Sequence, residues 1–179
     1  MSLFEKLRGW RTPARPESGS VDGSWAGGER RGKARVNARA GTRVLVVDDS
    51  ATIVALLRKM LRQNGYEVIE AVDVASALAR VAENEPELIF LDIVLPDGDG
   101  FQVLRGLRRQ PATRDVPVIM MSGNAQATEQ FYVQRIGADD FMKKPFSRAE
   151  VFSRIEALLD AERRPRRAGQ RIGIPEELA

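Results

Sequence analysis

The chain of 179 residues contains no cysteine and no histidine. Without cysteine it has no disulfide framework and no thiolate metal site. Without histidine it lacks imidazole zinc ligands, a Ser/His or Cys/His catalytic pair, and a histidine that could itself carry a phosphoryl group. Its apolar runs are far shorter than the roughly 18 to 20 residues that span a bilayer, and its N-terminus lacks a signal-peptide core. We therefore expect a soluble, cytoplasmic protein.

The net charge of +3 is unevenly distributed, because residues 44–159 are mildly acidic and the basic surplus lies toward the two ends. Residues 1–41 are rich in Gly, Ser, Pro and Arg, and we interpret them as a disordered basic extension. A single domain is expected over 42–160, followed by a flexible tail over 161–179. An amphipathic membrane anchor over residues 1–10 is the less favoured interpretation, because so short a helix is marginal in water.

Apolar runs that fit buried strands alternate with segments of helical periodicity. The strands are expected at 43–47, 66–71, 88–91, 117–122 and 139–142. The helices are expected at 53–61, 74–83, 101–109, 126–136 and from 147 onward, the last beginning with a Ser147/Glu150 capping box. In the second helix, Leu78, Val81 and Ala82 are expected to face inward. Five repeats of strand then helix predict an α/β fold, a doubly wound parallel sheet with helices on both faces.

In a parallel sheet the carboxyl ends of all strands lie along one edge. Asp48 and Asp49 follow the first predicted strand, Asp92 follows the third, Ser122 ends the fourth and Lys144 follows the fifth. Each of these residues alone would more often be a turn former, a helix cap or a surface lysine. Their joint arrival at one edge favours a functional site.

Three carboxylates at one edge repel each other, so protons or a cation must accompany them. An all-oxygen ligand set points to a hard divalent ion, Mg²⁺ by preference. A phosphoryl group bound to that ion would lie in line with a free oxygen of Asp92, which would act as nucleophile and form an acyl phosphate. The Lys144 ammonium and the Ser122 hydroxyl would neutralise the remaining phosphoryl oxygens.

These motifs together resemble the receiver domain of two-component response regulators. The resemblance rests on the acid pair Asp48-Asp49, the run from Asp92 to Gly100, Ser122, and Lys144-Pro145-Phe146. It covers roughly 42–160 and implies a flavodoxin-like (βα)5 fold with strand order 2-1-3-4-5.

The resemblance also implies a role for each site residue. Asp92 would be the phosphoacceptor and Lys144 the phosphate-sensing lysine. Asp48, Asp49, Asp92 and the backbone carbonyl of Val94 would hold Mg²⁺, and Ser122 and Phe141 would form the switch pair. The phosphoryl donor would be a histidine kinase or a small acyl phosphate. A protein target would bind the face formed by the fourth helix, fifth strand and fifth helix.

The stretch after the last helix leaves no room for a DNA-binding or catalytic module, so we expect a stand-alone switch protein that assists its own phosphorylation and is not a separate enzyme. In this respect the chain resembles stand-alone regulators of chemotaxis and of pilus-based twitching. Asp48-Asp49-Ser50 followed by Thr52-Ile53, together with Pro145-Phe146-Ser147, slightly favours the twitching type. Val94 cannot orient a hydrolytic water, which predicts a long-lived acyl phosphate.

The sequence leaves two alternatives open. The first is an interaction module that works without phosphorylation, in which the basic tails and a helix face do the binding. The second is a Mg²⁺-dependent phosphatase, which fits the chemistry but lacks a cap domain and a second aspartate two residues after Asp92. The run from Asp97 to Gly100 is too short for an EF-hand calcium loop, and there is no Gly-x-x-x-x-Gly-Lys phosphate loop.

Overall fold

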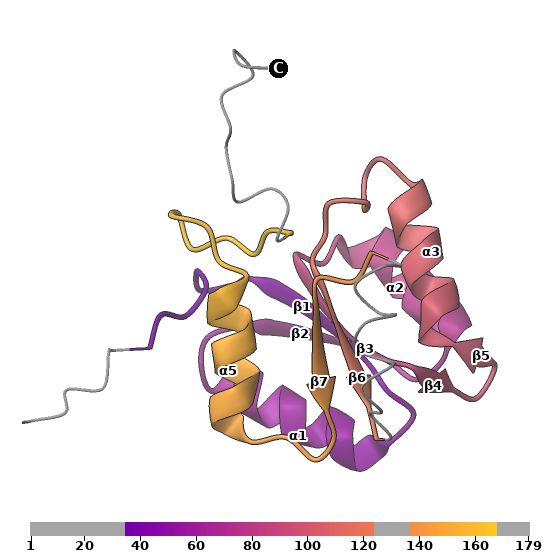
Figure 1. Ribbon diagram of the computed structural model, residues 1–179, viewed down its shortest axis with the longest axis horizontal. Helices are drawn as coiled ribbons and strands as arrows, with labels where there is room; N and C mark the ends of the chain where they lie inside the picture. Colours follow the sequence, from indigo (N-terminus) through magenta and orange to yellow (C-terminus); the bar gives the residue numbers. More distant parts are fainter. Residues whose placement is uncertain (1–34, 124–136, 168–179) are drawn as a thin grey trace, which may run out of the picture. The chain divides into compact units, whose positions relative to one another are not determined.

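The computed structural model describes residues 35–123 and 137–167, which fold around one five-stranded sheet (Figure 1). Its strands are β1 (Arg43–Val47), β2 (Glu67–Ala71), β3 (Leu88–Asp92), β6 (Val118–Ser122) and β7 (Asp140–Lys143). All neighbouring strands are parallel, in the order β2-β1-β3-β6-β7. Counting only these five strands, the order is 2-1-3-4-5. The predicted doubly wound α/β fold is therefore confirmed.

Helices cover both faces of the sheet. The helices α1 (Ala51–Arg62) and α5 (Arg148–Ala157) lie on one face, and α2 (Val74–Asn84) and α3 (Gly100–Arg109) lie on the other (Figure 1). The helix expected over 126–136 and the amphipathic segment 1–10 lie outside the described residues. Within the part of the chain that the structure describes, no helix has the length and apolar character needed to cross a bilayer.

The central strands are buried on both sides, as expected for a sheet between two helical layers. Val44 and Val46 of β1 belong to the core on the α1/α5 side, and Leu45 and Val47 belong to the core on the α2/α3 side. All five residues of β3 are buried. Because apolar side chains pack around the whole strand, β3 fixes the position of Asp92, the carboxylate at its end.

Polar side chains begin each described helix. Ser50, Asp73, Asp99 and Ser147 accept hydrogen bonds from backbone N–H groups in the first turns of α1, α2, α3 and α5, respectively. Such caps satisfy N–H groups that have no partner within a helix. Of the predicted Ser147/Glu150 capping box, the half in which Ser147 accepts from Glu150 N is confirmed. The capping box of α2, formed by Asp73 and Ser76, was not predicted.

The orientation predicted for α2 is wrong at two positions. Ala77 and Val81 face the sheet, but Leu78 is 39% exposed and Ala82 is also exposed. Helical spacing allowed either neighbouring stripe to face inward, and the observed rotation of α2 turns Leu78 and Ala82 toward α3. There they line a groove of about 430 Å³ between the two helices.

A two-stranded antiparallel hairpin lies in the connection from β3 to α3, where no strand was predicted. Its strands are β4 (Val94–Leu95) and β5 (Gly98–Asp99), with Val94 opposite Asp99. Leu95 is buried, whereas the Val94 side chain is 70% exposed. We call residues 93–99 the hairpin segment.

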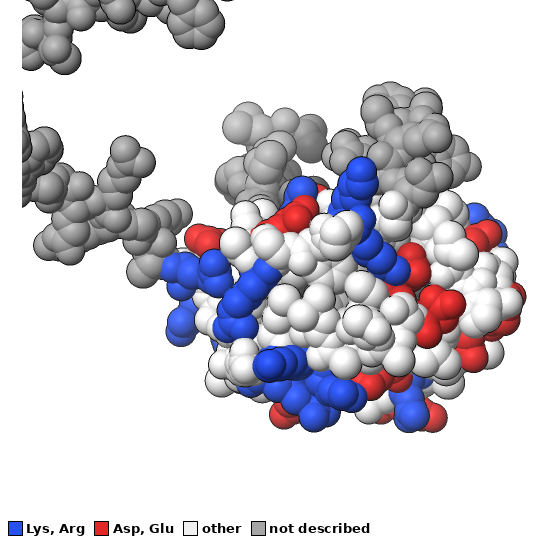
Figure 2. All heavy atoms as spheres, turned by 90° about the horizontal axis from the view of Figure 1, so that it is seen from below, with Lys and Arg blue, Asp and Glu red and all other residues white. Residues whose placement is uncertain are grey.

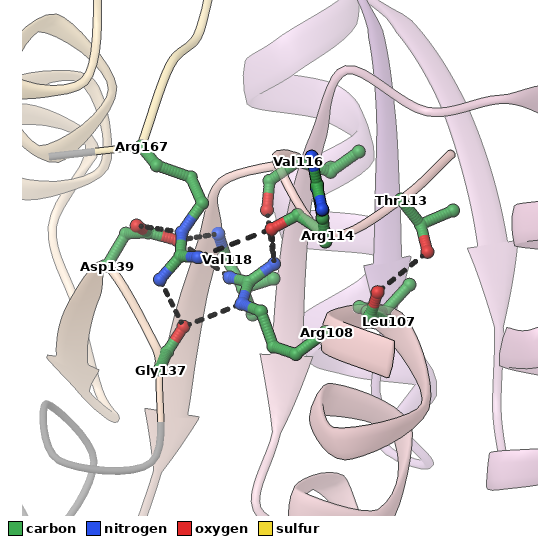
Figure 3. Close-up of polar contacts among 9 residues, drawn as sticks. All are labelled: Leu107, Arg108, Thr113, Arg114, Val116, Val118, Gly137, Asp139 and Arg167. Carbon is green, nitrogen blue, oxygen red and sulfur yellow. Dashed lines mark hydrogen bonds and ion pairs between the residues drawn. The ribbon is translucent and has the colours of Figure 1, made fainter. Parts of the chain in front are cut away.

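Asp139, just before β7, forms ion pairs with Arg108 and Arg167 (Figure 3). Its Oδ2 accepts hydrogen bonds from the Arg108 guanidinium and from Val118 N, both at 2.9 Å, and its Oδ1 accepts one from Arg167 Nε at 3.0 Å. Arg108 and Arg167 also donate to the carbonyl oxygen of Gly137. This cluster ties α3, β6 and the C-terminal segment to one carboxylate whose side chain is 3% exposed.

Candidate functional site

Three carboxylates meet at the carboxyl edge of the sheet. Asp48 and Asp49 follow β1, Asp92 ends β3, and one oxygen of each lies within 4.8 Å of the others. They meet because β1 and β3 are adjacent, with Val47 opposite Leu91. Figure 2 looks at this edge from below and shows acidic and basic side chains next to one another on it. The convergence predicted for the first and third strand ends is therefore observed.

The three carboxylates differ in burial. Asp48 is completely buried and Asp92 is 5% exposed, whereas Asp49 is exposed. Asp48 is held from two directions, because its backbone N–H donates to Ala71 O at 3.1 Å and its Oδ1 accepts from Ser50 N at 2.9 Å. The site thus has a rigid inner carboxylate and an accessible outer one.

Lys144 joins the cluster from the end of β7, the edge strand of the sheet. Its Nζ lies 2.6 Å from Asp48 Oδ2 and 2.7 Å from Asp92 Oδ2. The backbone N–H of Lys144 donates to Ser122 O at 2.8 Å, which fixes the lysine where the chain leaves β7. A single ammonium group therefore bridges the two buried carboxylates.

Burial and charge shift two pKa values in the site. Burial raises the pKa of the Asp92 carboxyl and the Asp48 charge adds to this, although the Lys144 ammonium opposes both. Burial by itself would lower the pKa of Lys144, but hydrogen bonds and charges from Asp48 and Asp92 outweigh it and raise that pKa. Both shifts favour the protonated forms: the two carboxylates hold Lys144 as a cation, and burial opposes the ionisation of Asp92.

The remaining predicted residues surround this cluster. Ser122 ends β6 and is 4% exposed, and Phe141 of β7 is 6% exposed, with its ring in the core on the α2/α3 side. Val94 lies beside Asp92, because its N–H is 3.4 Å from Asp92 Oδ1. Ser122 and Val94 therefore lie with the acidic cluster at the carboxyl edge, whereas Phe141 lies within β7, opposite Met120.

The donor set suits a hard divalent cation. Asp48 Oδ2 is buried and, among the described residues, receives no aligned hydrogen bond beyond its ion pair with Lys144. Asp49 adds an exposed carboxylate that a hydrated ion can reach. Three carboxylate oxygens without a nitrogen or sulfur donor are the ligands that Mg²⁺ prefers. The residues present thus fit Mg²⁺.

Sequence reasoning missed two residues that shape the site. A Cβ added to Gly100 would overlap the backbone carbonyl oxygen of Asp92, so α3 approaches the end of β3 closely only because this residue is glycine. Asp97 in the hairpin segment bonds to the start of α2. The Gly100 position had a local signal, a glycine next to a helix start, but the partner of Asp97 is distant in sequence.

Comparison with known proteins agrees with this geometry. The sequence model of the response regulator receiver domain matches residues 44–156. Over 117 residues, 65% of this chain, the chain is 40% identical to the phosphate regulon transcriptional regulatory protein PhoB of Escherichia coli and 44% identical to the transcriptional regulatory protein PrrA of Mycobacterium tuberculosis. The match covers 51% and 49% of those proteins, so the chain matches about half the length of these curated relatives.

Solved structures show the same fold. The chemotaxis protein CheY4 of Vibrio cholerae superposes with a TM-score of 0.63 at 28% identity, covering 67% of this chain and 100% of that one. A response regulator described as putative, from Chloroflexus aurantiacus, superposes with a TM-score of 0.62 at 30% identity, covering 65% of this chain and 95% of that one.

Proposed function

Because the chain belongs to the response regulator receiver domain family, we propose that it is a phosphorylation switch in which Asp92 accepts a phosphoryl group from a histidine kinase. One observation carries the proposal: Lys144 lies 2.6 and 2.7 Å from two buried carboxylates that, with Asp49, can hold a divalent cation. An ion pair that only stabilised the fold would need one carboxylate for the one lysine, whereas three carboxylates lie together in this cluster. A cluster with excess carboxylate at a sheet edge suits metal-assisted phosphoryl transfer instead.

In the proposed reaction an Asp92 oxygen attacks the phosphorus of a phosphohistidine. The P–N bond breaks, the imidazole leaves with its electron pair, and Asp92 becomes an acyl phosphate. Asp48, Asp49, Asp92 and the Val94 carbonyl would hold Mg²⁺, which supplies positive charge for the phosphoryl oxygens. Lys144 stabilises another of these oxygens, and the Ser122 hydroxyl hydrogen-bonds to the phosphoryl group once it is bound.

Output in this proposal is a change of protein contact. Ser122 moves toward the phosphoryl group and Phe141 adjusts behind it, which remodels the surface around β7 and α5. A partner that prefers the remodelled surface reads the signal in the cytoplasm. The chain in this account is a switch that assists its own phosphorylation and performs no separate enzymatic reaction.

The comparisons support two kinds of output. Similarity to a chemotaxis protein favours a motility pathway, chemotaxis or pilus-based twitching. Identity of 40–44% to transcriptional regulatory proteins favours a second candidate, a role in transcriptional control. Both candidates require phosphorylation of Asp92, which separates them from an interaction module that works without it.

The proposed phosphorylation is tested by measuring intact mass after incubation with acetyl phosphate and Mg²⁺. The native chain should gain one phosphoryl group, and the gain should be lost with EDTA and in Asp92→Asn. An unmodified mass in folded native protein would favour the phosphorylation-independent module.

Val94 should prolong the life of the acyl phosphate. Val94 is 70% exposed and lies beside Asp92, so water can reach the site, but valine can neither orient that water nor accept its proton. Val94→Asn should therefore lose its phosphoryl group several-fold faster, as followed by intact mass after removal of acetyl phosphate. Val72→Asn, at another exposed valine of the described residues, is the control and should leave the rate unchanged. Equal rates in native protein and Val94→Asn would contradict the prediction.

A further inference from the structure

Two aspartates share the N-terminus of α2. Asp73 caps its own helix, because its Oδ1 accepts from Ser76 N at 2.7 Å. The side chain of Asp97 reaches the same helix end from the hairpin segment, where Oδ1 accepts from Val74 N at 2.7 Å and Oδ2 accepts from Ala75 N at 3.1 Å. The first three N–H groups of α2 are thus all bonded to carboxylates, two of them to a residue that is more than 20 positions away.

The Asp97 contact is more than is needed to begin a helix. One capping side chain usually satisfies one or two N–H groups, and Asp73 with Ser76 already forms a capping box. Both oxygens of Asp97 are used, and the positive end of the helix dipole favours its charge. What the contact adds is a link between the loop after β3 and the loop after β2.

The hairpin segment is held at its other end as well. Gly100 N donates to Ile93 O at 2.8 Å, and Asp99 accepts from Gln102 N at 2.9 Å as the cap of α3. Val94 pairs with Asp99 and Leu95 with Gly98, so Asp97 lies in the turn between the two short strands. Without Asp97, the anchors left to the hairpin segment among the described residues are α3, the buried Leu95 and the hydrogen bond from Ile93 N to Met121 O at 3.0 Å.

The hairpin segment carries the group that would complete the metal site. Val94 follows Asp92 by two residues, and its N–H is 3.4 Å from Asp92 Oδ1. A metal site with one backbone ligand depends on how firmly that backbone is held. The neighbouring loop is itself fixed to the site, because Ala71 O accepts from Asp48 N.

We propose that Asp97 is a positioning residue, which clamps the hairpin segment to α2 and thereby holds the Val94 backbone in place for Mg²⁺ and phosphoryl transfer at Asp92. This inference rests on the proposed function of the site. Asp97 acts through the backbone between it and Val94, and it touches neither the ion nor the phosphoryl group.

The test compares Asp97→Ala with Asp73→Ala, which removes the other carboxylate from the same helix end. Mg²⁺ affinity is measured by calorimetric titration without a phosphoryl donor, and backbone exchange in 93–99 by hydrogen–deuterium exchange. Asp97→Ala should weaken Mg²⁺ binding about tenfold, the low end of what loss of a supporting partner costs, and exchange in the hairpin segment should accelerate. Asp73→Ala should lower thermal stability while keeping native Mg²⁺ affinity and hairpin exchange.

Phosphorylation gives a second readout. The phosphorylation rate of Asp97→Ala should be below the native rate at low Mg²⁺ and should return toward it at saturating Mg²⁺. Asp97→Asn keeps one acceptor oxygen, so its phosphorylation rate should be intermediate. The inference is overturned if both alanine variants lose affinity equally, or if Asp97→Ala binds Mg²⁺ like the native chain. If the native chain binds no Mg²⁺ and gains no phosphoryl group, the proposed function fails, and unchanged hairpin exchange in Asp97→Ala would then reject the clamp as well.

Discussion

Asp139→Ala is expected to lower the free energy of unfolding by about 3–5 kcal/mol, the range for removing one partner of a buried ion pair. The variant leaves the Arg108 side chain, 14% exposed, without its carboxylate and next to the Arg167 guanidinium. Burial, together with the Arg167 charge, already lowers the pKa of Arg108 to about 10, even though Asp139 opposes this shift. At neutral pH the guanidinium stays charged, so it keeps its hydrogen bonds to backbone carbonyl oxygens but loses the buried carboxylate that balances its charge.

Urea unfolding of Asp139→Ala and Asp115→Ala measures this effect. Asp115 is the matched control, because it pairs with Arg114 at 3.7 Å but both side chains are at least half exposed. Exposed pairs contribute about 0–1 kcal/mol, so this variant should stay close to the native stability. A similar small loss in both variants would show that the Asp139 cluster contributes no more than a surface ion pair.

Gly100→Ala is expected to abolish most phosphorylation and to destabilise the fold. The new Cβ would overlap the carbonyl oxygen of Asp92, so either α3 or the end of β3 must move. Overpacking of this kind costs about 1–3 kcal/mol. Displacement of a reacting group by about 1 Å can cost a factor of about 100 in rate, which is the loss expected for phosphorylation from acetyl phosphate.

Gly106→Ala is the matched control in the same helix. Its Cβ would lie 3.4 Å from Leu78 Cδ2, a contact with a flexible side chain, and alanine is the better helix former. We expect native phosphorylation and a stability gain of up to about 1 kcal/mol. Phosphorylation of Gly100→Ala at the native rate would mean that the close approach of α3 to Asp92 is unimportant for the site.

The parallel sheet could be predicted because buried apolar strands such as β1, β3 and β6 alternate with helices. Its strand order was implied only by the resemblance to receiver domains. The meeting of Asp48, Asp92 and Lys144 followed from topology alone, since parallel strands deliver their ends to one edge. Lys144 was predicted as a site residue without any distances. The contacts of 2.6 and 2.7 Å add that its ammonium group bridges Asp48 and Asp92.

Other features had no local signal. The strands of the hairpin segment are two residues long, too short for alternation to be recognised. Leu78 and Val81 fit the same helical stripe, and only packing against the sheet decided that Leu78 would face the groove. Asp97 and Asp139 find partners that depend on how distant segments return to the sheet, which spacing in the sequence does not encode.

The most direct test of the central claim is to locate the modified residue. After incubation with acetyl phosphate and Mg²⁺, borohydride reduction converts an aspartyl phosphate to homoserine, which peptide mass spectrometry can assign to a position. We expect homoserine at position 92 and at no other aspartate, and none when Mg²⁺ is withheld. Homoserine at Asp48 or Asp49, or unmodified Asp92 in folded protein, would contradict it.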